Sequence, residues 1–116
     1  MDYQYIQLDY LEKMAVGDQD TRRKLLQMLI SELESSGPRI KALWKSQNRT
    51  ELQWLCHHLK STFPFVGNER LANANRELEQ YLRQGKDFNA LQPLLIDIKT
   101  LIPKALKELR IELKKS

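Results

Sequence analysis

The stretch LQWLCHHLKSTF, residues 52–63, decides the fold of this chain. On a helical wheel at about 100° per residue, its apolar side chains fall into one stripe, which is formed by Leu52, Leu55, Cys56, Leu59 and Phe63. Such spacing of three and four residues is typical of a helix that packs one face against a core. The stretch therefore predicts an amphipathic helix with one buried face.

His57 lies on the other side of this predicted helix, about 140° from the centre of the apolar stripe, so we expect its imidazole to face water. Lys60 and Ser61 follow at i+3 and i+4 and are its neighbours on the helix surface. An ordinary imidazole, with a pKa of about 6.5, is mostly neutral at pH 7 and offers a lone pair for in-line attack on phosphorus. The pattern suits a surface that accepts a phosphoryl group.

Three more side chains of this stretch can be assigned to the core, the edge of the stripe or the exposed face. Cys56 is expected to be a small buried apolar residue. His58 falls near the edge of the stripe and is expected to pack or to form a hydrogen bond there. Trp54 projects toward the His57 side, where it could anchor a binding partner or fold over the preceding helix.

Chain length and composition indicate one globular domain, residues 1–116. Hydrophobic residues make up 41% of the chain and charged residues 29%, which is ordinary for a globular domain and excludes wholesale disorder. No apolar run approaches the roughly 18 residues that a membrane span needs, and residues 1–4 lack the basic start of a signal peptide. Cys56 is the single cysteine, so no internal disulfide or thiolate metal site is possible. We expect a cytoplasmic protein.

The net charge of +4 makes a nucleic-acid binder one alternative. Acidic and basic residues are interleaved along most of the chain, however, and only residues 104–115 are clearly basic. No cluster of Arg and Lys is interleaved with stacking aromatic residues. The same charge suits an acidic protein partner, so a basic helical nucleic-acid binder is the less favoured interpretation.

The remaining sequence predicts helices and no strand. We expect helices at about 8–16, at 20–45 with a kink at Gly37-Pro38, at 68–85, and from Asp87 onward with a bend at Pro103. Asn48 to Glu51 has capping-box spacing and should open the helix of His57, which should end by Pro64 or run weakly to Gly67. Short connections favour antiparallel neighbours. The expected fold class is all-α: an antiparallel up-down four-helix bundle with a short extra N-terminal helix.

Landmarks along the whole chain resemble the histidine phosphotransfer (HPt) domain family: Leu55-Cys56-His57-His58-Leu59-Lys60-Ser61, then Gly67-Asn68-Glu69-Arg70-Leu71, then Leu78-Glu79. The family pattern reads alanine-histidine-any-leucine-lysine-glycine, a glycine about ten residues after the histidine, and a later leucine-glutamate pair. The resemblance implies a shuttle in a multistep phosphorelay, which takes a phosphoryl group from the aspartyl phosphate of one receiver domain and passes it to another.

The resemblance also implies residue roles. His57 matches the phosphorylated histidine, and Lys60 matches the lysine that offsets charge at the phosphoryl oxygens. Glu79 and Arg83 match positions where the family often places polar groups beside the histidine, although at i and i+4 they could equally be a plain helix ion pair. Ser61 replaces the usual glycine, and we expect receiver docking to survive the added hydroxyl.

The resemblance implies receiver domains of hybrid sensor kinases and of response regulators as partners, which we expect to dock around Trp54, His57, Lys60 and Ser61 on a monomer. No cofactor or metal is expected in this chain, because it has no Gly-rich phosphate loop or nucleotide motif, and the receiver should supply Mg²⁺. The chain would be a carrier and substrate without kinase activity. The alternative is an HPt-like module that docks a receiver or kinase without carrying phosphate, which the presence of His57 argues against.

Overall fold

Five helices and no strand occur in the computed structural model of the chain, which describes residues 2–116. The helices are α1 (Asp9–Ala15), α2 (Gln19–Lys45), α3 (Arg49–Val66), α4 (Glu69–Arg83) and α5 (Phe88–Lys115). The prediction of an all-α chain is confirmed for these residues. None of these helices has both the length and the apolar character that crossing a bilayer requires.

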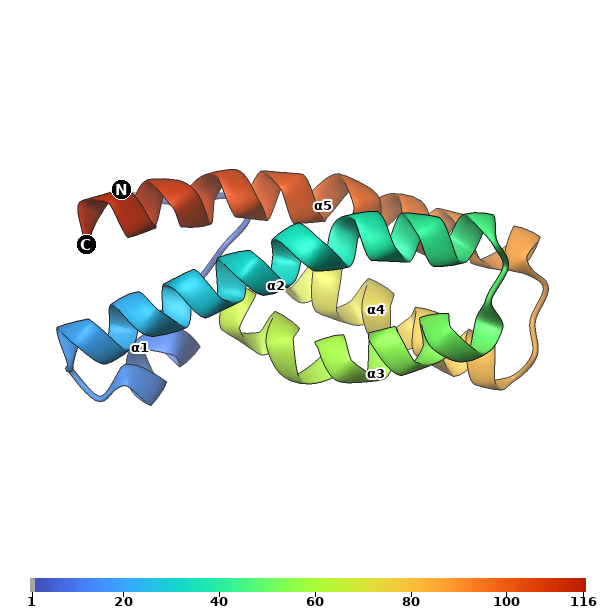
Figure 1. Cartoon of the computed structure of the whole chain (residues 1–116), viewed down its shortest axis with the longest axis horizontal. Helices are drawn as coiled ribbons and strands as arrows, with labels where there is room; N and C mark the ends of the chain where they lie inside the picture. Colours follow the sequence, from blue (N-terminus) through green and yellow to red (C-terminus); the bar gives the residue numbers. More distant parts are fainter. Residues whose placement is uncertain (1) are drawn as a thin grey trace.

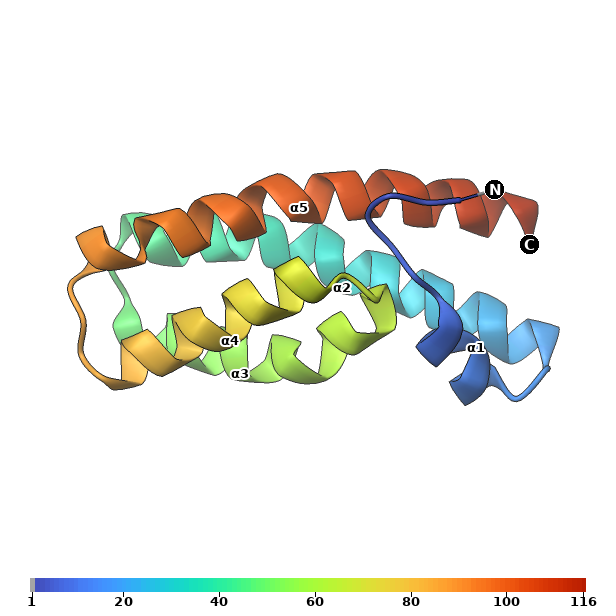
Figure 2. The same ribbon diagram turned by 180° about the vertical axis from the view of Figure 1, so that it is seen from behind.

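The four long helices surround a shared interior, and successive ones run in opposite directions (Figure 1). Each of them packs against two others, since α2 and α4 both contact α3 and α5. The short helix α1 contacts α2 and α3, and the segment before it crosses toward α5 (Figure 2). Helix α3, which carries His57, therefore lies between α2 and α4.

Local capping residues start the long helices where the sequence predicted. The side chain of Asn48 accepts a hydrogen bond from the backbone N–H of Glu51, and Asn68 accepts one from Leu71. Asp87 caps α5 in the same way. Each cap satisfies a helix N–H that has no partner within the helix, which stabilises the helix by about 1 kcal/mol.

The prolines do not end the helices that contain them. Pro38 lies inside the continuous helix α2, and α3 passes Pro64 and ends at Val66. Leu33 and Ile40, on either side of Pro38, are both fully buried. An interior proline costs about 3 kcal/mol, and burying two large aliphatic side chains contributes roughly 1.5–3 kcal/mol each. The burial of Leu33 and Ile40 therefore outweighs the free-energy cost of the interior proline.

The predicted apolar stripe of α3 is buried throughout and forms part of the core. On α5 the apolar spacing from Leu91 to Ile98 predicts that Leu94 faces the core, and this prediction was wrong, because Leu95 is buried whereas Leu94 is only half-buried. The buried face of α5 also includes Leu101 and Leu106, so it is wider than a single stripe. Steps of three and of four residues from Leu91 both fit the helical period, so the period alone does not choose between Leu94 and Leu95.

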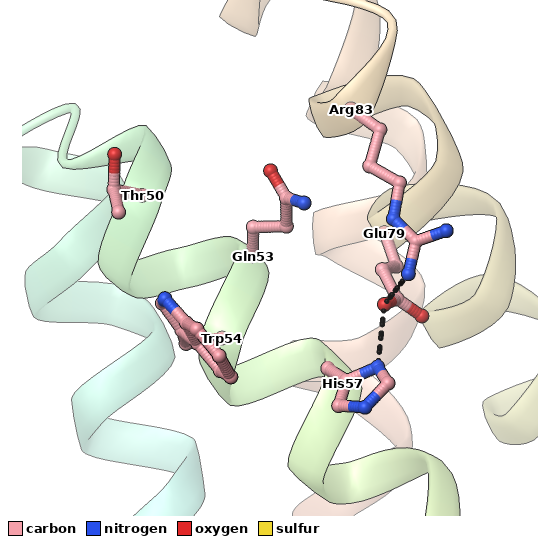
Figure 3. Close-up of a pocket in the computed structure, with 6 residues that line it drawn as sticks. All are labelled: Thr50, Gln53, Trp54, His57, Glu79 and Arg83. Atoms are coloured by element: carbon pink, nitrogen blue, oxygen red, sulfur yellow. Dashed lines mark hydrogen bonds and ion pairs between the residues drawn. The ribbon is translucent and has the colours of Figure 1, made fainter.

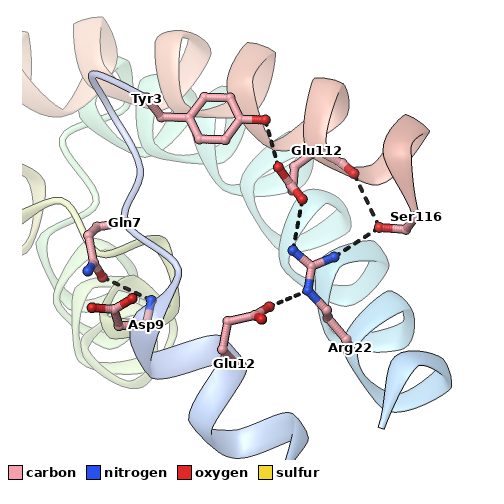
Figure 4. A network of polar contacts seen from close by, with 7 residues as sticks. All are labelled: Tyr3, Gln7, Asp9, Glu12, Arg22, Glu112 and Ser116. Carbon is pink, nitrogen blue, oxygen red and sulfur yellow. Dashed lines mark hydrogen bonds and ion pairs between the residues drawn. The ribbon is translucent and has the colours of Figure 1, made fainter. Parts of the chain in front are cut away.

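A polar network fastens the N-terminal segment to α2 and α5 (Figure 4). The Tyr3 hydroxyl donates to Glu112 Oε1 at 2.7 Å, and Arg22 donates to Glu112 Oε2 at 2.8 Å and also to Glu12. The hydrogen bonds from Tyr3 and Arg22 hold the pKa of Glu112 below its usual value. Sequence periodicity gave no sign of this network, since its members come from opposite ends of the chain.

Gly67 is the point where the N-terminal segment meets the end of α3. The Gln7 N–H donates to the Val66 carbonyl at 2.9 Å, Gly67 has a φ of +73°, and a Cβ added there would lie 1.9 Å from the Gln7 carbonyl oxygen. We expect Gly67→Ala to lower the free energy of unfolding by roughly 2 kcal/mol in urea denaturation. Gly85→Ala is the matched control, because Gly85 has a φ of +72° with nothing within 4 Å. Equal losses in both variants would contradict the contact with Gln7.

Candidate functional site

His57 stands on the side of α3 that faces away from the core. Its side chain is 55% exposed, whereas the preceding residue, Cys56, is fully buried. The structure therefore confirms the exposure of His57 that the helical wheel predicted. The imidazole is reachable by a second protein.

The buried carboxylate of Glu79 holds one nitrogen of this ring (Figure 3). Glu79 Oε2 lies 2.9 Å from His57 Nδ1 and 2.9 Å from an Nη2 nitrogen of Arg83. Its other oxygen lies 3.9 Å from Lys60 Nζ. The Glu79 side chain is only 4% exposed, so these contacts form with little competition from water.

The contact with Glu79 determines which nitrogen of His57 is free. An ionised carboxylate can only accept hydrogen bonds, and Arg83 and Lys60 supply positive charge beside this one. The His57 Nδ1–H is therefore the donor, and the lone pair lies on Nε2. Figure 3 shows Nε2 on the side of the ring that faces away from Glu79. The site presents one nucleophilic atom in a defined orientation.

Both interpretations of the Glu79 and Arg83 pair hold at once. The two side chains form the i, i+4 ion pair, and the same carboxylate oxygen also contacts His57. A pair exposed on the surface is worth little, but here the carboxylate is buried against α3 while the guanidinium stays 55% exposed. The pair belongs to the His57 site.

Trp54 is 67% exposed. Its ring lies perpendicular to the His57 ring, with 6.4 Å between centroids. Together with Thr50 and Gln53 it forms one wall of a recess of about 250 Å³ that reaches Glu79 and Arg83 (Figure 3). Sequence reasoning missed Thr50 and Gln53, although their spacing of seven and four residues before His57 places them on its helix face.

Lys60 and Ser61 are both exposed one turn beyond His57. Ser61 also lines a second recess between α2 and α3, next to Met28 and Glu32. His58 is more exposed than predicted, at 59% for the side chain, but its Nε2 lies 3.0 Å from Glu32 Oε1, so the predicted hydrogen bond is present. The structure brings Trp54, Lys60, Glu79 and Arg83 around His57, and places His58 toward α2.

Cys56 provides a chemical check on this geometry. Burial raises the pKa of its thiol to about 12, and the thiolate is the reactive form. We expect 5,5′-dithiobis(2-nitrobenzoate) at pH 8 to react with the native protein roughly 100-fold more slowly than with the urea-unfolded chain, since reaction requires opening of the core. Equal rates would show that the apolar side of α3 is open to solvent.

No group of three His, Cys, Asp or Glu side chains within residues 2–116 is arranged to hold a metal ion. The expectation that a partner supplies Mg²⁺ stays a prediction.

The sequence and the structure were compared with those of known proteins. The model of the Hpt domain family matches residues 24–113. The comparison with curated proteins gives no match. Among solved structures, the chain is similar to the crystal structure of the HPT domain from an Hpt sensor hybrid histidine kinase of Shewanella, with a TM-score of 0.84 and 15% identity over 97% of this chain and 96% of that chain. At this identity the likeness concerns the fold, whereas the matched family residues include both His57 and Glu79.

Proposed function

The chain belongs to the Hpt domain family, and from this premise we propose that it is a histidine-containing phosphotransfer protein of a multistep phosphorelay. It accepts a phosphoryl group on His57 from the aspartyl phosphate of a receiver domain and passes it to another receiver. One observation carries the proposal: the exposed His57 ring has Nδ1 bound to buried Glu79, which leaves Nε2 free.

The chemistry follows from this arrangement. The Nε2 lone pair attacks phosphorus in line, the bond from phosphorus to the aspartyl oxygen breaks, and the receiver carboxylate leaves with the electron pair. The ring gains positive charge while its proton stays on Nδ1, where Glu79 accepts the hydrogen bond and stabilises that charge. Lys60 adds a cation near the phosphoryl oxygens. Transfer to the next receiver reverses these steps.

The partners are receiver domains of hybrid sensor kinases and response regulators, which dock around Trp54, His57, Lys60 and Ser61. The receiver supplies Mg²⁺ and most of the charge neutralisation, so this chain acts as a carrier and substrate rather than as a kinase. Residues 1–116 serve as one monomeric domain, an antiparallel up-down four-helix bundle to which α1 adds a short helix. The alternating directions of α2 to α5 support this assignment (Figure 1).

A transfer assay tests the proposal. A receiver carrying ³²P-labelled aspartyl phosphate is mixed with this protein and Mg²⁺, and the label is followed on a gel. We expect label on this chain that is stable in base and labile in acid, as phosphohistidine is. Binding of the receiver without any label would contradict the carrier role and support the alternative, a docking module that carries no phosphate.

Ser61 tests the docking part of the proposal. Its exposed side chain lies one turn from His57, where a receiver must approach. We expect Ser61→Gly to transfer at the wild-type rate or faster, and Ser61→Gln to slow transfer by roughly 10-fold or more because its bulk holds the reacting atoms apart. Phosphorylation by phosphoramidate, a small donor, should be equal in all three proteins. Equal transfer rates from the receiver would contradict the docking surface.

A further inference from the structure

Asn75 is a buried polar residue at the interface of α4 with α3. It is 1% exposed, and its side-chain N–H donates to the Cys56 carbonyl oxygen at 2.9 Å. The amide oxygen has no hydrogen-bond partner among the described residues. Of the three buried polar residues in residues 2–116, which are Ser36, Asn75 and Glu79, two lie on α4.

Asn75 and Glu79 are four residues apart, so they share one face of α4. They contact consecutive residues of α3, because Asn75 binds the backbone of Cys56 and Glu79 binds the side chain of His57. The other buried positions of α4 are apolar: Leu71, Ala74, Leu78 and Leu82. The two polar contacts therefore lie one helical turn apart, at the level of the reactive histidine.

The Asn75 contact is not needed to satisfy the Cys56 carbonyl. Cys56 lies well inside α3, where the regular i+4 hydrogen bond is available to its carbonyl oxygen. The unpaired amide oxygen of Asn75 costs free energy of folding, whereas an apolar side chain of similar size would bury no unsatisfied atom. Stability alone does not account for an amide at this position.

The amide at position 75 is explained by the register of α4, that is, its position along α3. Leu and Ala side chains tolerate small shifts of one helix along another, because they repack with little loss. A directional hydrogen bond to a backbone oxygen does not tolerate such shifts, and a shift of about 1 Å is enough to misplace a reacting group. The hydrogen bond from Asn75 fixes the position of α4 along α3 one turn before Glu79. It therefore also fixes the position of the Glu79 carboxylate that contacts His57.

We propose that Asn75 is a positioning residue for phosphoryl transfer: it sets the register of α4 against α3 and thereby keeps Glu79 on Nδ1 of His57. The inference rests on the proposed function of His57. It predicts that loss of the amide disturbs the His57 tautomer and slows transfer, while the protein remains folded.

The first test needs no receiver. Nitrogen NMR of ¹⁵N-histidine-labelled protein reports which ring nitrogen of His57 carries the proton. We expect the Nδ1–H form in the wild type and a mixture of both tautomers in Asn75→Leu, whose free energy of unfolding in urea should match or exceed that of the wild type. Asn73→Leu is the matched control, because Asn73 is exposed on the same helix. If Asn75→Leu does not fold, Asn75→Ala, which cannot overpack the site, replaces it.

The second test measures transfer. At saturating phosphorylated receiver, we expect Asn75→Leu to transfer about 10-fold more slowly, by analogy with the loss of the outer partner of a metal-ligating histidine. The half-saturating receiver concentration should stay unchanged, since Asn75 is buried away from the docking surface. A wild-type tautomer and a wild-type rate in the variant would overturn the inference. A wild type that accepts no phosphoryl group would instead contradict the proposed function, and the tautomer spectra alone would then decide whether Asn75 positions Glu79.

Discussion

His57→Gln is expected to accept no phosphoryl group from a labelled receiver, a loss of roughly 1,000-fold or more in transfer rate. The glutamine amide keeps a polar, exposed side chain on α3 but offers no nucleophilic lone pair on nitrogen. The site on α3 is solvent-exposed, so the fold should be unchanged. Gel autoradiography of the transfer reaction measures the loss, with circular dichroism as a check of helicity.

His58→Gln is the matched control. His58 is the next residue along α3 and is exposed to a similar degree, 59% against 55% for the His57 side chain. Its ring contacts Glu32 rather than Glu79, so it should retain transfer. Label on His57→Gln at the wild-type level, or loss of label in a folded His58→Gln, would show that the site is assigned to the wrong residue.

Glu79→Leu is expected to have the second largest effect, a fall of roughly 10–100-fold in the rate of transfer at saturating receiver. The substitution removes the acceptor from Nδ1, so the ring is free to adopt the other tautomer, and no carboxylate stabilises the positive charge that forms as Nε2 attacks. Single-turnover reactions that are quenched at successive times measure this rate.

Glu79→Gln separates the two contributions of this carboxylate. The amide oxygen can still accept from Nδ1–H but carries no charge, so its rate should lie between those of the wild type and Glu79→Leu. Glu77→Leu, at an exposed position of the same helix, controls for changes in α4 itself. Transfer by Glu79→Leu at the wild-type rate would contradict the role of the buried carboxylate.

Local signals made most of the fold predictable from the sequence. The stripe from Leu52 to Phe63 and the caps at Asn48, Asn68 and Asp87 act within one or two turns, so they can be read without knowing the partners. The sequence also predicted one helix through Pro38, because the seven-residue interval from Leu33 to Ile40 keeps the apolar face in phase across the proline. The docking of the N-terminal segment onto Gly67 and Glu112 has no periodic pattern at all.

The candidate site also combines features that local signals predicted with contacts between helices that they did not. The helical wheel predicted the exposure of His57 and Trp54, whereas the contact between His57 and Glu79 joins two helices and came from the resemblance to a family. Asn75 was not predicted, although a signal existed: an amide interrupts the apolar face of α4 one turn before Glu79. A polar residue at a core position needs a hydrogen-bond partner, because burial without one is costly.

The most direct measurement locates the phosphoryl group on the ring. Protein labelled with ¹⁵N-histidine is phosphorylated by the receiver, and phosphorus–nitrogen coupling identifies the bonded nitrogen. We expect coupling to Nε2 of His57, with the proton retained on Nδ1 beside Glu79. Coupling to Nδ1, or to either nitrogen of His58, would contradict this expectation.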